Sequence, residues 1–264
     1  MNYLMQIKNQ KPLIHNITNT VVANFSANGL LAIGASPAMA NAPEEAAEMA
    51  SHADALVINI GTCTQDQVNA MIFAGKAANK KGIPVILDPV AIGATTFRTS
   101  AIKQILSKVD VLVIRGNAGE IAVLAGLDTE MKGADTLVDE IDSELAIHVA
   151  KKYRAVVIAT GKTDTITDGD SLTQCKNGVA MLPNVTGTGC LLTAIVGAFS
   201  SICADIYDAS VQAVCSYGVA AELAMEHTKG PGTFLPALLD ELYDLSEEKV
   251  KAKANIRELT LKGE

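Results

Sequence analysis

The chain has 264 residues, which is enough to bury a substantial core in one large domain or two small ones. Apolar residues make up 49% of the sequence and charged residues 19%, a composition typical of globular rather than disordered chains. The formal charge of -8 argues against a general nucleic-acid binder, which would normally carry a basic face, but it does not exclude a phosphate ligand.

The first residues, MNYLMQIKNQKP, lack the apolar core of a secretory signal, and the sequence holds no uninterrupted apolar run of about 18 residues. We therefore expect neither a leader nor a membrane span. The five cysteines are widely spaced and form no CxxC pair, so we expect no disulfide framework and no structural zinc site. A reducing cytoplasm is the simplest location for such a chain.

Residues 12 to 51 are rich in Asn, Ala, Gly and Ser, and they are nearly free of charge from Pro12 to Pro43. The simple interpretation is a packed helix and a tight loop. A functional interpretation is a pocket for a small molecule near the mouth of a sheet, walled by Asn24, Met39 and nearby backbone. Both interpretations stay open at this stage.

Short apolar runs alternate with helical patterns along most of the chain. The runs are apolar through their middle, which is typical of strands covered on both faces. Their alternation with helices predicts βαβ units, a parallel central sheet and an α/β fold. The expected strands are residues 55–60, 84–88, 110–114 and 155–159, and the expected helices between them include 65–82 and 99–109.

The pattern changes at residues 163–183, where DG and NG steps separate short strand-like pieces and predict a β-hairpin at the sheet edge. Three long helices are then expected, at 188–203, 208–228 and 234 to about 260. Asp208 is expected to cap the second, and GPG at 230–232 to break the chain before the third. We see no internal repeat or linker, so residues 1–264 are expected to form a single domain.

Polar residues follow the ends of several predicted strands, where ligands bind in open parallel sheets. Asp88 ends one run, Arg115 follows the next, and Thr160 and Gly161 end the one after. The loop NVTGTGC, residues 184–190, is expected to open at the same edge. Each of these features alone has an ordinary structural explanation, but their convergence from four connections favours a binding site.

The segment NAGE, residues 117–120, begins a predicted helix, where Asn117 and Glu120 can form a reciprocal capping box. Beside Asp88 and a phosphate, Glu120 can also hold magnesium through water, because Mg2+ commonly keeps several waters and uses only one or two carboxylates. These two roles do not exclude each other.

In the NVTGTGC loop, Gly187 and Gly189 let backbone N–H groups turn toward an anion at the positive end of the following helix. The loop is neither a GxGxxG dinucleotide motif nor a GxxxxGKS/T phosphate loop. Cys190 is expected at the helix start, where the helix dipole and nearby donors can lower the pKa of a thiol from about 8.5. It is a candidate general base or covalent nucleophile, with His15 the one histidine expected near the pocket, and a purely structural cysteine is the alternative.

Several segments together resemble the ribokinase-like superfamily and, within it, the hydroxyethylthiazole kinases. In the wider superfamily the glycine loop usually ends in aspartate, the base that accepts the hydroxyl proton, whereas the thiazole kinases resemble this chain in placing cysteine there. The resemblance implies a three-layer α/β/α fold with a mostly parallel sheet and no lid domain. The matching segments are KPLIHNITNTVVANFSANGLLAIGASPAM at 11–39, LDPVAIGAT at 87–95, IRGNAGEI at 114–121, TG at 160–161 and NVTGTGC at 184–190.

The resemblance further implies transfer of the ATP γ-phosphate to the hydroxyl of 4-methyl-5-(2-hydroxyethyl)thiazole, in thiamine biosynthesis or salvage, by a homotrimer with active sites at subunit boundaries. A kinase of hydroxymethylpyrimidine or a sugar is one alternative, and a non-catalytic thiazole or nucleotide sensor is another. The resemblance implies that Met39 and Gly187 contact the thiazole and that Arg115, Thr160 and Gly161 contact ATP. Asp88 and Glu120 are implied to organise Mg2+. The amides of Gly187, Gly189 and Cys190 are implied to stabilise charge, and Cys190 to remove the hydroxyl proton.

Overall fold

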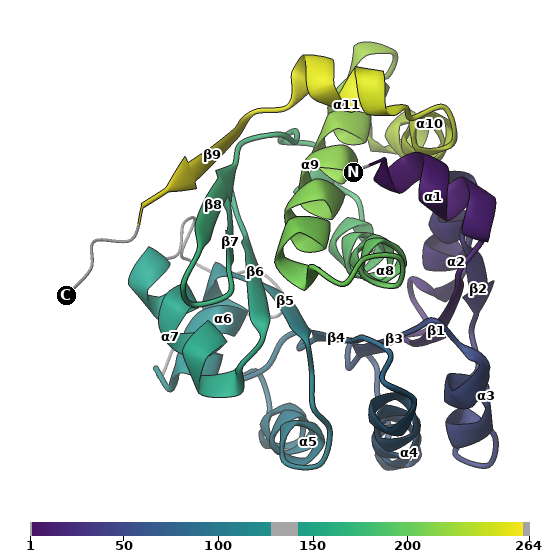
Figure 1. The fold of residues 1–264 in the computed structure, drawn as a ribbon, viewed down its shortest axis with the longest axis vertical. Coiled ribbons are helices and arrows are strands. Elements are labelled where there is room, and N and C mark those ends of the chain that lie inside the picture. Colours follow the sequence, from purple (N-terminus) through teal and green to yellow (C-terminus); the bar gives the residue numbers. More distant parts are fainter. Residues whose placement is uncertain (1, 128–141, 261–264) are drawn as a thin grey trace.

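The computed structural model describes residues 2–127 and 142–260, and their strands form one sheet (Figure 1). The strand order is β2-β1-β3-β4-β5-β6-β7-β8-β9. Neighbours from β2 to β6 pair in parallel, and neighbours from β6 to β9 pair antiparallel. The strands are β1 Leu13–Ile17, β2 Ser36–Ala38, β3 Ala55–Asn59, β4 Val85–Asp88, β5 Val113–Asn117, β6 Val156–Thr160, β7 Asp164–Thr167, β8 Leu172–Cys175 and β9 Ile256–Leu259.

Helices cover both faces of the sheet, which confirms the three-layer α/β/α prediction (Figure 1). Helices α3 to α7 pack on one face, and α8 and α9 pack on the other with α1, α2, α10 and α11 around them. The helices are α1 Tyr3–Gln10, α2 Ala23–Ile33, α3 Ala46–His52, α4 Gln65–Lys81, α5 Thr96–Leu106, α6 Ala118–Ala125, α7 Ser143–Tyr153, α8 Thr188–Ser200, α9 Ile206–Glu226, α10 Pro231–Tyr243 and α11 Glu247–Lys253.

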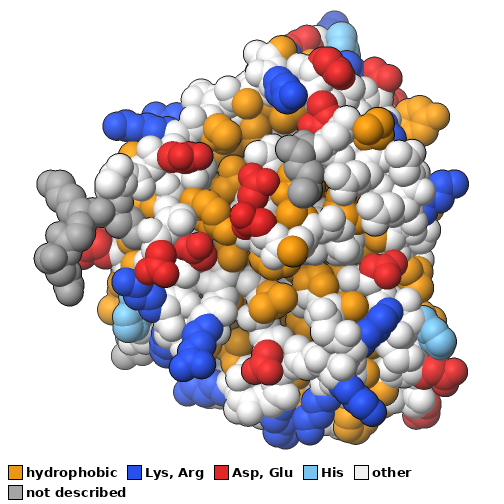
Figure 2. All heavy atoms as spheres, viewed as in Figure 1, with side chains coloured by type: hydrophobic (Ala, Val, Ile, Leu, Met, Phe, Trp, Pro, Cys, Tyr) orange, Lys and Arg blue, Asp and Glu red, His pale blue; other side chains and the backbone are white. Residues whose placement is uncertain are grey.

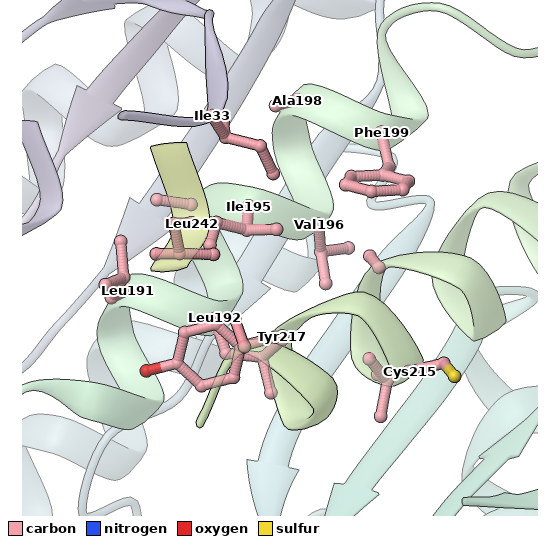
Figure 3. Packing of buried hydrophobic residues seen from close by; sticks show 14 of the residues in the cluster. Ile33, Leu191, Leu192, Ile195, Val196, Ala198, Phe199, Cys215, Tyr217 and Leu242 are labelled. Atoms are coloured by element: carbon pink, nitrogen blue, oxygen red, sulfur yellow. The ribbon is translucent and has the colours of Figure 1, made fainter. Parts of the chain in front are cut away.

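The glycine loop is placed by α8, a largely buried helix that contacts β1, β3 and β4. Close approach to the sheet depends on Gly197, because a β-carbon there would lie 2.8 Å from Cγ2 of Val57. Figure 3 shows the apolar side chains of α8 packed among Ile33 of α2, Tyr217 of α9 and Leu242 of α10. The start of α8 is therefore held against the carboxyl ends of the central strands by packing on both sides.

Local signals in the sequence account for several element boundaries. Thr64 and Gln67 form a capping box at the start of α4, and Gly82 ends that helix in a left-handed conformation with φ of 81°. The predicted capping box of Asn117 and Glu120 is also present, at the start of α6. The hairpin predicted at 163–183 corresponds to β7 and β8, which pair antiparallel.

Two predictions near the ends of the chain are wrong. Residues 12–51 form more than a helix and a loop, because Leu13–Ile17 and Ser36–Ala38 add two parallel strands to the sheet. Polar residues interrupt the first of these segments, which hid its strand character. The third C-terminal helix ends at Tyr243 rather than near residue 260, and the chain re-forms a short helix and then β9 against β8.

The cap of α9 is also different from the prediction. Asp205 accepts a hydrogen bond from the backbone N–H of Asp208 and is the N-cap, so Asp208 lies in the first turn. There its Oδ2 accepts a hydrogen bond of 2.7 Å from the hydroxyl of Tyr3 in α1. The acidic side chain thus links two helices instead of beginning one.

The surface seen in Figure 2 carries both acidic and basic side chains, with apolar side chains exposed between them. Large apolar side chains at the surface include Val21 and Leu31, which are 66% and 58% exposed. Across the described ranges, no helix combines the length and the apolar character required to cross a lipid bilayer.

Candidate active site

Asp88 lies at the carboxyl end of β4 and is fully buried. Its Oδ2 accepts hydrogen bonds of 2.8 Å from Asn59 Nδ2 and from Thr193 Oγ1. Its Oδ1 is buried without a hydrogen-bond partner among the described residues, and burial raises the pKa of the carboxyl group. A buried carboxylate oxygen without a partner is costly, so this atom is suited to a bound cation.

Glu120 is also buried, and both of its oxygens are engaged by backbone. Oε2 accepts from the N–H of Asn117 at 2.8 Å, and Oε1 accepts from the N–H of Ala91 at 2.7 Å. Ala91 has a left-handed conformation with φ of 55°, which is unusual for a residue with a β-carbon. Burial, followed by the charge of Asp88, raises the pKa of Glu120 to about 7. Glu120 therefore orders the loop after Asp88 and adds a second acidic group beside it.

Arg115, in β5, connects the acidic pair to the next strand. Its Nη1 lies 3.9 Å from Oδ2 of Asp88, and its Nη2 donates to Oγ1 of Thr160 at 2.6 Å. Gly161 is exposed just beyond Thr160, and its N–H donates to Oδ1 of Asp164 at 3.0 Å. Burial raises the pKa of Asp164 to about 6, against the opposing effects of the Gly161 N–H and of Arg115.

The two glycines of the NVTGTGC loop meet the site in different ways. Gly187 caps α8 in a left-handed conformation with φ of 91°, and a β-carbon there would lie 2.6 Å from Cγ1 of Val22. At Gly189 a β-carbon would lie 2.6 Å from Nη1 of Arg115. The loop therefore borders the N-terminal segment at Gly187 and the guanidinium group at Gly189, with the N–H groups of the first helical turn between them.

The turn between the two glycines is stabilised by a hydrogen bond from α9. The hydroxyl of Tyr217 donates to the carbonyl of Thr188 at 2.8 Å, and both groups are buried. Figure 3 shows the Tyr217 ring lying beside Leu192, with its oxygen directed toward the start of α8. Oγ1 of Thr188 donates to the carbonyl of Leu182 at 2.9 Å. These bonds fix the turn without using its N–H groups.

Cys190 is partly buried in the first turn of α8, and its sulfur accepts from two asparagines. Nδ2 of Asn59 lies 3.2 Å from Sγ, and Nδ2 of Asn19 lies 3.5 Å from it. Burial and the charge of Asp88 raise the pKa of Cys190 to about 12, although Arg115 and the two amides act in the opposite direction. The pKa is therefore raised rather than lowered, because desolvation and a neighbouring carboxylate outweigh the helix start.

Two of the three residues expected to line the substrate pocket, Met39 and Asn24, lie outside the hydrogen-bonded cluster around Asp88 and Cys190. Met39 is half-buried directly after β2, where the neighbouring carbonyl of Ala40 is 2.7 Å from Nε2 of the buried His15. Asn24 is exposed on α2 and accepts at Oδ1 from Nδ2 of Asn28 at 3.0 Å. The structure thus places Met39 at the strand-end edge of the sheet, whereas Asn24 faces outward.

Three polar residues of the cluster were missed by the sequence analysis: Asn19, Asn59 and Thr193. Asn59 had a usable signal, because it is the polar residue that ends β3, as Asp88 ends β4. Thr193 follows Cys190 by three residues on α8, which places both on one side of the helix. Asn19 lies in the loop after β1, a strand that the sequence analysis did not predict.

The two acidic residues fit a magnesium ion that keeps water or phosphate ligands better than they fit a metal ion whose ligands all come from the protein. Among the described residues, no group of three or more His, Cys, Asp and Glu side chains is placed to hold a metal. Mg2+ usually takes one or two carboxylates and completes its shell with phosphate oxygens and water. Asp88, with its bare Oδ1, and Glu120 beside it are therefore consistent with a Mg2+ that arrives with a nucleotide.

Comparison with known proteins agrees with this geometry. A profile of the hydroxyethylthiazole kinase family matches residues 4–248. The chain is 56% identical over 256 residues to hydroxyethylthiazole kinase 2 of Oceanobacillus iheyensis, covering 97% of this chain and 98% of that protein. The chain belongs to the hydroxyethylthiazole kinase family.

Solved structures place the family fold in a wider group. The structure of hydroxyethylthiazole kinase from Pyrococcus horikoshii superposes with a TM-score of 0.88 at 40% identity and covers 97% of each chain. A pyridoxal kinase structure from Staphylococcus aureus superposes with a TM-score of 0.68 at 15% identity, covering 95% of this chain and 99% of that one. This chain thus shares its fold with a pyridoxal kinase, in agreement with the ribokinase-like fold that the resemblance implied.

Proposed function

We propose that this protein transfers the γ-phosphate of ATP to the hydroxyl of 4-methyl-5-(2-hydroxyethyl)thiazole, in thiamine biosynthesis or salvage. One observation carries the proposal. The guanidinium of Arg115 lies against the backbone of Gly189 at the start of α8 and 3.9 Å from Oδ2 of Asp88, whose Oδ1 has no hydrogen-bond partner among the described residues. Asn59 joins the same Asp88 to Cys190 by hydrogen bonds. Phosphoryl transfer depends mainly on such alignment and charge stabilisation.

On the nucleotide side, each residue has a role that its position supports. Arg115, with Thr160 and Gly161 next to it, is proposed to bind the phosphates of ATP. The N–H groups of Gly187, Gly189 and Cys190 stabilise charge on the transferred group, because they lie at the positive end of α8. Mg2+, held by Asp88 and Glu120 directly or through water, would neutralise phosphate charge when bound.

On the acceptor side, Cys190 is proposed to assist removal of the hydroxyl proton without being indispensable. Its raised pKa leaves little thiolate at neutral pH, which agrees with a modest contribution. A weak base is enough, because the transition state of phosphoryl transfer is loose. Met39 and Gly187 are proposed to contact the thiazole, with Asn24.

The exposed position of Asn24 on α2 is consistent with a homotrimer in which that helix borders the site of a neighbouring subunit. Val21 and Leu31 flank the same region and are exposed apolar residues suited to an interface. Light scattering across a range of concentrations is expected to give the mass of a trimer. A monomer at every concentration would contradict this part of the proposal.

We also propose that residues 1–264 act as a single kinase domain in the cytoplasm. The family profile, which matches residues 4–248, supports the first point. The five cysteines are free thiols, which is in keeping with a reducing compartment.

The decisive assay measures ADP release by purified protein with Mg2+ and ATP. Hydroxyethylthiazole, hydroxymethylpyrimidine and ribose are compared as acceptors, and strong turnover is expected with the thiazole alone. Turnover with another acceptor would favour a different kinase of the superfamily. Tight binding of the thiazole without turnover would favour the sensor and overturn the proposal.

A further inference from the structure

The side chain of Asn59 makes hydrogen bonds to both halves of the proposed site. It lies at the carboxyl end of β3 and is buried, with 1% of its surface exposed. Nδ2 is 2.8 Å from Oδ2 of Asp88 and 3.2 Å from Sγ of Cys190. One amide nitrogen therefore contacts the carboxylate on the magnesium side and the thiol on the acceptor side.

The orientation of this amide follows from its partners. The backbone N–H of Gly61 lies 2.9 Å from Oδ1 of Asn59, and an N–H group can only donate, so that atom must be the oxygen. Nδ2 of Asn19 donates to the same oxygen at 2.9 Å. The NH2 group is consequently directed at Asp88 and Cys190. It has two hydrogens, one for each of them.

We infer that Asn59 is a positioning residue that ties Cys190 to Asp88 and so sets the placement of the acceptor side relative to the nucleotide side. The inference rests on the proposed function, because it assigns a role within that reaction. Reaction of two bound substrates requires their reacting atoms to be held in contact and in line. A rigid link between the groups that face each substrate serves that alignment.

The bond pattern distinguishes this role from ordinary packing. Backbone and the side chain of Asn19 hold the oxygen of Asn59, which leaves its two donors for the two side chains that face the substrates. By contrast, Asn79 at the end of α4 exchanges both of its bonds with the backbone of Asp110. Asn79 is therefore a matched asparagine with a structural role, outside the proposed site.

The test uses the full chain with Asn59→Asp and Asn59→Ala, assayed for ADP release with hydroxyethylthiazole. Asn59→Asp keeps the shape of the side chain but puts an acceptor oxygen where both donors were. We expect kcat to fall about 10- to 100-fold in both variants, the size typical of residues that orient the ligands of a metal ion. We expect KM for ATP to change little, because Asn59 makes no contact with Arg115 or Thr160 among its described hydrogen bonds. Asn79→Ala is expected to lower the unfolding midpoint while leaving kcat unchanged.

A double-mutant cycle separates a positioning role from a general structural one. If Asn59 acts in part through Cys190, Asn59→Ala costs less in a Cys190→Ala background than in the wild type. Equal losses in both backgrounds, or an unchanged kcat in both Asn59 variants, would overturn the inference. A wild type that does not phosphorylate the thiazole would instead contradict the proposed function. Should Asn59→Ala fail to fold, the same cycle is run with Asn59→Asp.

Discussion

The guanidinium of Arg115 lies against the α-carbon of Gly189, so closely that a methyl group at position 189 would come within 2.6 Å of Nη1. A residue on β5 thus depends on the absence of a side chain on α8, more than 70 positions later in the sequence. The contact joins the cationic group and the first helical turn into the surface proposed to bind the phosphates of ATP.

Gly189→Ala is therefore expected to impair ATP binding more than folding. The methyl group displaces the guanidinium from its place, and a charge-assisted hydrogen bond is worth about 1.5–3 kcal/mol. KM for ATP should rise about tenfold or more, with a small change in the unfolding midpoint, since the arginine is a flexible side chain. Steady-state kinetics with ATP varied would measure this, and an unchanged KM would contradict the role given to the contact.

Gly187→Ala is expected to act mainly through stability. The φ of 91° is unfavourable for alanine by about 1–2 kcal/mol, and contact with Val22 adds crowding of about 1–3 kcal/mol. Urea unfolding should show the loss directly. A variant as stable as the wild type would mean that the loop adopts another conformation.

The sequence predicted the centre of the molecule better than its margins. The four central strands, the hairpin and the capping box of α6 came from short apolar runs and turn residues, which are local signals. β1 and β9 could not be recognised, because their polar residues lack the apolar pattern of a buried strand. These segments are strands through their pairing with β3 and β8, which the sequence alone does not show. The convergence of Asp88, Arg115, Thr160 and Cys190 followed from the rule that parallel strands end at one edge. The hydrogen bonds among them did not follow from that rule. Asn59 meets the same rule, because it ends β3, but it was not singled out.

The raised pKa of Cys190 leads to a prediction on the pH dependence of catalysis. The thiol is protonated below about pH 12, so the thiolate fraction, and with it kcat, is expected to rise as the pH increases from 6 to 9. Cys190→Asp should keep substantial kcat with a weaker pH dependence, because a carboxyl group ionises at a much lower pH than a thiol in the same surroundings. Cys190→Ala should lose more, and an alanine variant that equals the wild type at every pH would show that Cys190 is not the base.

Asp88→Asn is expected to separate activity from stability. Because folding raises the pKa of Asp88, its ionised form opposes folding at neutral pH, and the amide removes that cost. The variant should unfold at a higher urea concentration than the wild type when neither nucleotide nor magnesium is present. At the same time kcat/KM should fall at least about 100-fold, since the oxygen suited to Mg2+ is lost.

Thr193→Val is the matched control, because it removes one hydrogen bond to Oδ2 of Asp88 and leaves Oδ1 in place. Magnesium titrations should show a raised requirement in Asp88→Asn and a smaller change in Thr193→Val. Activity of Asp88→Asn at the wild-type level in low magnesium would contradict the metal role.

Asp164 provides a test of stability against pH. Its pKa is raised from 3.8 to about 6, so the folded state holds the proton more tightly. The stability that this provides is fully present below about pH 4 and is lost as the pH rises through about 6. Asp164→Asn, which still accepts from Gly161, should therefore be more stable than the wild type at pH 7–8 by about 1–2 kcal/mol, after allowance for partial exposure. Urea unfolding of both proteins should show this difference in stability at pH 7–8 and its disappearance below about pH 4.

The strand order also means that the two sides of the proposed site come from two separate stretches of sequence. The strand order places β1, β2 and β3, from the first 60 positions, on the side proposed for the acceptor, and β4, β5 and β6 on the side proposed for the nucleotide and its metal. Asn59 and α8 stand on the boundary between the two halves. In this arrangement, substitutions in the N-terminal third of the sequence can change the choice of acceptor. The residues proposed to bind the phosphates and Mg2+ stay the same. A chimera that exchanges this third between two kinases of the fold would carry its acceptor preference with it.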